Sequence, residues 1–302
     1  WEQNSPQVRQ WVNEKEARQS LKKGIETQLK RVSDLSKVQK FSELCKVPGS
    51  TAKDYLNKVV RYGNTNHAVL AIRFKGLNIA EPFVDLLAKD FIFNLENVQE
   101  LLDITRNEFN LFKPKWLRVE LTENKHSFWE HLNYQPDLRT LLGVIAELKE
   151  KPKPKRYHEL ALTQATDISF YSKYKADYDE FNTNAGIMAD EVHLSSQDDF
   201  QKLVDFGHTY QATIDGRWAG IIALSEGDFL GTKTWVVHEE FLTKEFRGHG
   251  FGAALQRHAI DRIDPSTHPL LIGTIHANNT PSLGTANRIG RTDIGGYWFL
   301  EL

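Results

Sequence analysis

The chain has 302 residues, of which 40% are hydrophobic and 26% are charged, and its formal net charge is −2. This length and composition suit two globular domains with substantial cores and do not suit a disordered chain. The near-neutral charge and the lack of a long basic stripe argue against nucleic acid as the main partner and against a polybasic membrane anchor.

The sequence contains no run of 18 apolar residues and no signal-peptide pattern, so we expect a soluble, cytoplasmic protein with no membrane partner. The single cysteine, Cys45, has no second thiol for a disulfide or a shared metal, and we predict a small buried apolar side chain. The eleven histidines form no His-Glu-x-x-His pattern, and no metal site is predicted.

The first 60 or so residues are predicted to be helical, because Leu21, Ile25 and Leu29 recur every four residues in a charged background. We expect this apolar face to pack against another element. Farther along, residues 67–76 and 116–121 alternate like strands, and residues 96–109 repeat like an amphipathic helix. The N-terminal half is therefore predicted to be an α/β domain.

The segment "LKEKPKPKR", residues 148–156, alternates proline with lysine, which favours an extended and self-repelling chain. We interpret it as a linker and predict an N-terminal domain at 1–148, a linker at 149–156 and a C-terminal domain at 157–302. A basic tail for nucleic acid is the alternative interpretation, which the short and internal position of the run disfavours.

After this segment the pattern predicts a strand at 157–164 and a mostly helical region with polar loops at 167–206. Residues 209–227 read as two strands joined by a turn at Asp215-Gly216. The next predicted strand, 232–242, runs into the glycine-rich stretch "EFRGHGFGAAL" at 245–255.

A helix is predicted behind the glycines, with Phe251, Leu255 and Ala259 on one apolar face and the polar Gln256, Arg257 and Asp261 pointing elsewhere. A strand at 270–275 follows. A strand, a glycine turn and a helix together form an anion site, since unpaired amides and the positive end of the helix dipole meet there. Arg247 adds a positive charge beside these amides.

The string Gly248-x-Gly250-x-x-Ala253 formally fits the dinucleotide fingerprint G-x-G-x-x-G/A. Too few residues follow it for the strands of a dinucleotide domain, and no acid lies at the position expected for the ribose. A nucleotide P-loop is also excluded, because no Gly-Lys-Ser/Thr follows. A purely structural turn is the alternative for the glycines taken alone.

The stretch Arg247–Ala253 resembles the acyl-CoA pyrophosphate loop of the GCN5-related N-acetyltransferase (GNAT) superfamily, whose pattern is Arg/Gln-x-x-Gly-x-Gly/Ala. The strand "LLIGTIH" followed by "ANNTPSLGTANRIGR" resembles the family's asparagine-led helix, which ends in a glycine. The resemblance spans residues 157–302. It implies a GNAT fold, a mixed and mostly antiparallel sheet with helices on both faces, and acetyl-CoA or another acyl-CoA as co-substrate.

The resemblance further implies that the strands at 232–242 and 270–275 splay apart to admit the thioester. It implies acetyl transfer by direct attack of an amine of a small molecule or peptide. The positions that it assigns to CoA binding are Leu242, through its backbone, and Arg247, Gly248, His249, Gly250, Phe251, Gly252, Ala253 and Asn279.

Transfer to an amine requires a group that takes up its proton. Strand alternation puts His238 and Glu240 on one face and Glu239 on the other, so we expect one carboxylate to face solvent. His276 ends the next strand near the expected splay, and histidine suits acid–base work near neutrality. We predict His276 as the first catalytic candidate and Glu240 as the second, with a hydrogen-bonded structural histidine as the alternative.

Many family members carry a tyrosine seven residues after the helix-leading asparagine, as the acid that protonates the leaving thiolate. Counted from Asn279, this position is Ala286. Ser282, Thr243 or Tyr297 is then the candidate substitute.

Two other functions stay open. GNAT-like domains of polyketide loading modules resemble the set Thr243, His276 and Arg291, which would imply decarboxylation of malonyl-CoA and acetyl transfer to an acyl carrier protein. A turn residue and a surface charge are the simpler interpretation of Thr243 and Arg291. The remaining alternative is a CoA-binding module without catalysis.

The N-terminal half is predicted to be a degenerate GNAT-like copy, in a tandem arrangement. Residues 117–148 align without gaps beside residues 271–302, with Asn124 on Asn278 and Asn133 on Asn287. This half has no Arg-x-x-Gly-x-Gly string, so we expect it to wall the acceptor pocket or a homodimer interface rather than to bind acyl-CoA.

Overall fold

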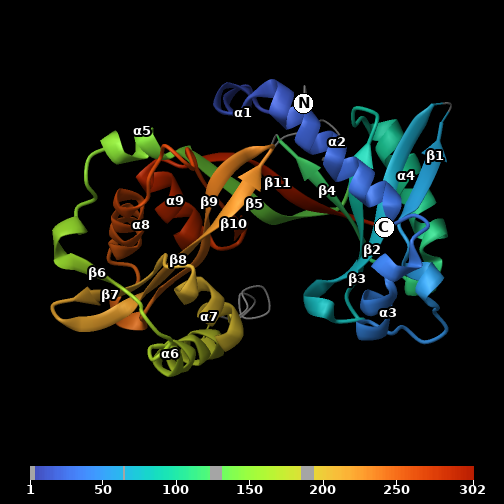
Figure 1. Cartoon of the computed structure of the whole chain (residues 1–302). Coiled ribbons are helices and arrows are strands. Elements are labelled where there is room, and N and C mark those ends of the chain that lie inside the picture. Colours follow the sequence, from blue (N-terminus) through green and yellow to red (C-terminus); the bar gives the residue numbers. More distant parts are fainter. Residues whose placement is uncertain (1–3, 64, 123–130, 185–193) are drawn as a thin grey trace. The chain divides into compact units, whose positions relative to one another are not determined.

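The computed structural model describes residues 4–63, 65–122, 131–184 and 194–302, and the chain divides into two compact units (Figure 1). Unit 1 consists mainly of Glu14–Asp137 and Gly295–Leu302, and unit 2 of Pro6–Asn13 and Leu138–Ile294. The units therefore differ from the predicted domains 1–148 and 157–302. Each unit includes a strand from the other half of the sequence, a pairing that local patterns do not reveal.

Unit 1 contains a five-stranded sheet in the order β1-β2-β3-β4-β11. Its parallel pair is β3 with β4, while β1 with β2, β2 with β3 and β4 with β11 are antiparallel. The elements of this unit are α2 (Glu14–Lys30), α3 (Gln39–Leu44), β1 (Lys58–Tyr62), β2 (Asn66–Phe74), β3 (Pro82–Lys89), α4 (Leu95–Glu108), β4 (Trp116–Leu121) and most of β11 (Thr292–Glu301).

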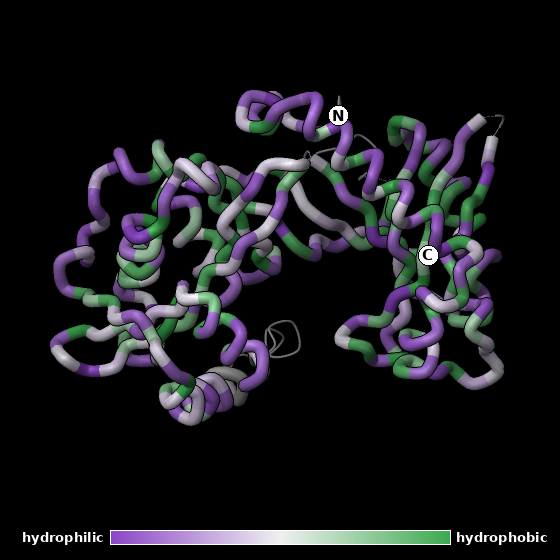
Figure 2. Tube along the Cα trace, viewed as in Figure 1, coloured by the Kyte–Doolittle hydropathy of each residue, from purple (hydrophilic) through white to green (hydrophobic). Residues whose placement is uncertain are grey.

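The strands and the amphipathic helix predicted for this half are confirmed, and Cys45 is fully buried as expected. The prediction that the apolar face of α2 packs against another element is wrong for two of its residues. Ile25 and Leu29 are 42% and 43% exposed, and Ala17 is the buried residue of this helix. Figure 2 shows α2 as a mostly hydrophilic segment, in keeping with its charged background.

Unit 2 contains a sheet in the order β5-β10-β9-β8-β7-β6. The pair β9–β10 is parallel and the other pairs are antiparallel. Its elements are α1 (Pro6–Trp11), most of β5 (Tyr134–Val144), α5 (Ile145–Glu150), β6 (Leu160–Gln164), α6 (Tyr171–Asn184), α7 (Gln197–Asp205), β7 (Thr209–Ile214), β8 (Arg217–Phe229), β9 (Thr232–Leu242), α8 (Phe251–Arg262), β10 (Leu270–His276) and α9 (Thr280–Ile289).

Both faces of this sheet are covered because the side chains of β8 alternate between two cores. Ile222 and Leu224 pack with α8 and the end of α9, whereas Ile221 and Ala223 pack with α6 and α7. The helices therefore lie on opposite sides of the sheet (Figure 1). The predicted turn also forms, with positive φ at both Asp215 (49°) and Gly216 (72°).

The proline–lysine segment is not a free linker, because Arg257 of α8 fastens it to the body of unit 2. The Arg257 guanidinium donates hydrogen bonds to the carbonyls of Leu148, Lys149 and Lys151 and pairs with Asp261 at 2.9 Å. The prediction that Gln256 and Arg257 point away from the core is wrong, since they are 1% and 4% exposed. A buried guanidinium needs several acceptors, and the segment supplies them.

Corresponding strands and helices of the two units are separated by the same number of residues along the sequence. β4 begins at Trp116 and β10 at Leu270, an offset of 154 residues (270 − 116). The same offset moves α4, Leu95–Glu108, onto residues 249–262, where α8 spans Phe251–Arg262. None of the helices that the structure describes is long and apolar enough to cross a membrane.

Candidate acyl-CoA site

The glycine-rich loop leaves the N-terminus of α8 without a side-chain cap. Gly250, the N-cap residue, has a φ of 86°, and Gly248 has a φ of 77°. A Cβ at Gly248 would meet nothing within 4 Å, so the loop is open on this side. The first amides of α8 therefore face a ligand space, as anion binding at a helix N-terminus requires.

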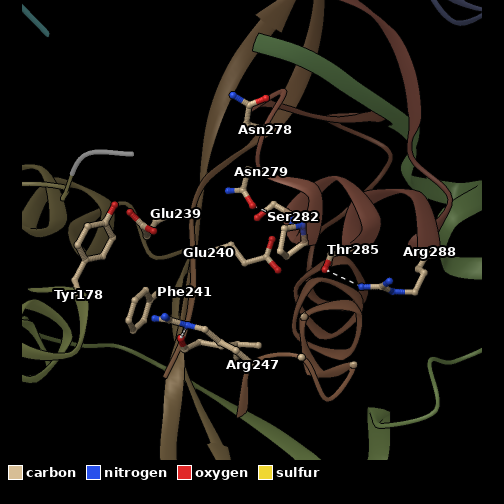
Figure 3. A pocket seen from close by; sticks show the side chains of 15 residues that line it. Tyr178, Glu239, Glu240, Phe241, Arg247, Asn278, Asn279, Ser282, Thr285 and Arg288 are labelled. Atoms are coloured by element: carbon tan, nitrogen blue, oxygen red, sulfur yellow. Dashed lines mark hydrogen bonds between the residues drawn. The ribbon is translucent and has the colours of Figure 1, made fainter. Parts of the chain in front are cut away.

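A pocket of about 590 Å³ lies against this loop, and its walls come from β9, α8 and α9, with Tyr178 from α6 (Figure 3). Leu242, Arg247, Gly248, Gly250, Gly252 and Asn279, all predicted to bind CoA, line it. His249 and Ala253 line a second cavity instead, and Phe251 is buried in the core. The full lining of the first pocket is Tyr178, Glu239, Glu240, Phe241, Leu242, Arg247, Gly248, Gly250, Gly252, Asn278, Asn279, Pro281, Ser282, Thr285 and Arg288.

The pocket opens where β9 and β10 separate. The two strands pair over only three positions, from Leu270↔Thr234 to Ile272↔Val236. Beyond Val236, β9 continues to Leu242 along β8 while β10 remains paired with β5. This is the splay that the family resemblance implied.

Arg247 stands at the loop end of the pocket in a fixed position. Its Nε donates to the carbonyl of Leu242, and its guanidinium lies 4.7 Å from the centre of the Phe241 ring. Burial lowers the pKa of Arg247 from its ordinary value, but an arginine stays charged at neutral pH. The loop end of the pocket is therefore cationic.

Glu239 and Glu240 point to opposite sides of β9, as strand alternation predicts (Figure 3). The expectation that one of them faces solvent is wrong, since both are partly buried and His238 is the exposed residue. Glu239 accepts hydrogen bonds from the Tyr174 hydroxyl at 3.0 Å and the Ser195 hydroxyl at 3.1 Å. Burial raises the pKa of Glu239 above its ordinary value.

Glu240 has the protonation behaviour expected of a general base working near neutral pH. Burial raises its pKa to about 7, against the opposing effects of a hydrogen bond from Gln256 and the positive charge of Arg291. A carboxylate with a pKa near the working pH can both accept and return a proton.

Arg291 lies behind this carboxylate and is buried, so its interpretation as a surface charge is wrong. It is 3% exposed and donates to the carbonyls of Leu141 at 2.8 Å and Gly273 at 3.2 Å. Its Nη1 lies 3.4 Å from Oε1 of Gln256, which links it to Glu240. Burial lowers the pKa of Arg291 to about 10.

Of the other catalytic candidates, Ser282 lines the pocket, in the first turn of α9. His276 ends β10 and is absent from the pocket lining, and its Nδ1 accepts a hydrogen bond from the Asn278 amide at 3.2 Å. Thr243 precedes the loop and is likewise outside the lining, and Tyr297 belongs to unit 1. Thr243, His276 and Arg291 do not meet in this pocket.

The sequence interpretation missed several lining residues on α9 and α6. Thr285 and Arg288 were not predicted, although they follow the predicted Ser282 at three-residue spacing on the face of α9 that lines the pocket. The Arg288 Nη2 donates to the Thr285 hydroxyl at 3.3 Å. This helical spacing is the signal that would have identified them. Tyr178 offered no such signal, because it comes from a distant helix.

Asn279 caps α9, since its side chain accepts a hydrogen bond from the Ser282 amide at 3.2 Å, and Gly290 ends the helix in the left-handed conformation with a φ of 96°. The predicted asparagine-led helix that ends in a glycine is therefore present.

Unit 1 closes the equivalent helix end with its own side chains. Asn94, the N-cap of α4, accepts from the Asn97 amide at 2.9 Å, and the Asn97 side chain accepts from the Asn94 amide at 2.9 Å. This reciprocal cap uses amides of the kind that remain open in α8. The two helices therefore differ at their N-termini, and that unit 1 does not bind acyl-CoA stays a prediction. Within the described ranges of the chain, no three His, Cys, Asp or Glu side chains are grouped to hold a metal ion.

Residues 169–290 match the family model of the GNAT acetyltransferases. The C-terminal half of the chain thus belongs to the GCN5-related N-acetyltransferase superfamily, as the loop and the asparagine-led helix indicated. Comparison with curated protein sequences gives no match.

Among solved structures, a GNAT-family acetyltransferase from Colwellia psychrerythraea is similar in fold, with a TM-score of 0.52 and 12% identity. The similarity covers 90% of this chain and 98% of that one. A tandem GNAT protein from the clavulanic acid biosynthesis pathway matches with a TM-score of 0.49 and 14% identity, over 89% of this chain and 96% of its own.

Proposed function

We propose that unit 2 transfers an acyl group, most simply acetyl, from acyl-CoA to an amine of a small molecule or peptide. The observation that carries the proposal is that the two ends of one pocket differ in chemistry. One end has the uncapped N-terminus of α8 and Arg247, and the other end has Glu240, where β9 and β10 separate. The first would bind the diphosphate of CoA, and the second would receive a proton.

In this mechanism the amides of Gly250 and the residues after it bind the diphosphate, and the open edge of β9 aligns the pantetheine arm. Glu240, ionised, accepts the proton that the amine loses as its nitrogen bonds to the thioester carbonyl carbon. When the carbon–sulfur bond then breaks, the departing thiolate takes a proton through the Ser282 hydroxyl, which regains one from water, and Glu240 releases its proton to solvent. Gln256 holds the Glu240 carboxylate, so it acts as a positioning residue.

The experiment is thiol release from acetyl-CoA with a panel of amines, carried out on the full chain. Glu240→Gln should reduce kcat/KM by about 100-fold or more, because a general base typically contributes at least that factor. Glu180→Gln, which changes an exposed carboxylate outside the pocket, is the matched control. Turnover unaffected by Glu240→Gln would contradict its role as base, and CoA binding without turnover of any amine would favour an inactive binding module.

A further inference from the structure

The acyl-CoA pocket contains a second carboxylate, Glu239, on the α6 side of β9. Glu239 and Glu240 are consecutive in β9 and point to opposite sides of the strand, yet both line the pocket (Figure 3). This is possible because β10 leaves the edge of β9 beyond Val236, so the pocket reaches both faces of the sheet there. The proposed mechanism gives Glu240 a role and leaves Glu239 without one.

The side chains that donate to Glu239 are both hydroxyls. Tyr174 of α6 and Ser195 each bind its Oε2, at 3.0 and 3.1 Å. Burial raises the pKa of Glu239 and the two hydroxyls lower it, but no Lys, Arg or His of the described ranges is among the groups that shift it. The burial of this carboxylate is therefore not offset by a cation from the part of the chain that the structure describes.

A structural role does not require the charge of Glu239. A glutamine could accept the same two hydroxyl hydrogen bonds through its amide oxygen, and burial would oppose it far less. A carboxylate differs from that amide chiefly in its attraction for a cation. A charge retained in a pocket wall, with hydroxyls for partners, therefore indicates a cationic ligand.

Aromatic rings line the same side of the pocket. The rings of Tyr178 and Phe241 stack with their centroids 5.7 Å apart, and both residues belong to the pocket lining. Aromatic faces attract cations, and the Phe241 ring already has the Arg247 guanidinium 4.7 Å from its centre. Glu239 lies beside Tyr178 (Figure 3). A carboxylate next to aromatic rings is a combination that suits an ammonium group.

We propose that the acyl acceptor is a diamine, and that Glu239 binds its second ammonium while the reacting amine lies at Glu240. The inference rests on the proposed function and names its class of substrate. The acyl group passes from the CoA sulfur to one nitrogen, and the other nitrogen keeps its protons, so the products are CoA and a mono-acylated diamine. Glu239 transfers no proton and determines specificity.

The test measures thiol release from acetyl-CoA by the full chain with the terminal diamines of propane, butane, pentane and hexane, each against the monoamine of the same chain. One charge-assisted contact predicts that kcat/KM is about 10- to 100-fold higher for the best diamine than for its monoamine. Glu239→Gln should remove this preference by raising KM for the diamine. Glu180→Gln, the exposed carboxylate of α6 outside the pocket lining, is the matched control and should keep the preference.

Four results would overturn the inference and leave the proposed function intact. They are equal wild-type kcat/KM for diamines and monoamines, acylation of other amines without any diamine, a preference that survives in Glu239→Gln, and an equal fall on both kinds of acceptor in that variant. A fall in the CoA affinity of Glu239→Gln in calorimetry would likewise show a structural role. If the wild type acylates no amine at all, the proposed function fails together with the inference.

Discussion

Glu240→Gln should make the protein more stable at pH 8 while removing its activity. In the fold, burial raises the pKa of Glu240 from 4.5 to about 7. At 1.36 kcal/mol for each pH unit, this difference corresponds to about 3 kcal/mol that opposes folding once the carboxylate is ionised. Glutamine has the same shape without the charge, so the variant does not lose this free energy of folding when the pH rises.

The pH dependence follows from the direction of the shift. Because the folded pKa lies above the unfolded value, Glu240 costs the fold nothing below pH 4.5, and its full cost is present above about pH 7. The free energy of unfolding of the variant, relative to wild type, should therefore rise by about 1–3 kcal/mol between pH 5 and pH 8. Urea denaturation at the two pH values measures it.

Glu180→Gln, an exposed carboxylate of α6, is the control and should show no comparable rise. If the free energy of unfolding of Glu240→Gln relative to wild type is the same at both pH values, burial does not raise the pKa of Glu240. The wild-type kcat/KM with an amine should in turn increase with pH through about 7, because only the ionised carboxylate accepts a proton.

Three further substitutions test separate parts of the structure. Gly250→Glu should abolish CoA binding in calorimetry, because a carboxylate would enter the anion site at a φ of 86°; unchanged affinity would contradict the loop assignment. Arg257→Met should lower the free energy of unfolding by at least about 2 kcal/mol and should speed hydrogen exchange of the backbone amides at 148–151. Unaltered exchange there would contradict the conclusion that Arg257 holds the proline–lysine segment in place. Asn94→Ala should cost about 1 kcal/mol in urea denaturation and leave CoA affinity unchanged, and a loss of that affinity would place a ligand at unit 1.

The sequence was sufficient to predict the features that depend on neighbouring residues. The strand at 232–242 and the helix behind the glycines follow from local periodicity, the asparagine-led helix follows from the family resemblance of one short stretch, and all three are present. The uncapped and open start of α8 was predictable for the same reason, since its parts lie within one short stretch.

Features that join distant residues were not predictable in this way. Arg257 reaches carbonyls more than 100 positions earlier in the chain, so the proline–lysine segment looked like a free linker. Arg291 looked like a surface charge because the groups that receive it, Leu141 and Gly273, belong to other strands. Glu240 was ranked below His276 as a catalytic candidate. The alternation of side chains along a strand shows on which face of the sheet a residue lies, but it does not show whether that face lines a pocket.

Each unit contains a strand from the other half of the sequence, and this arrangement affects the order in which the two sheets can form during synthesis. The sheet of unit 1 needs Gly296–Glu301 of β11, the last strand along the part of the chain that the structure describes, to pair with β4. Unit 1, most of which is synthesised first, therefore completes its sheet last. One edge of β4 stays unpaired while some 175 residues are added after Leu121 (296 − 121).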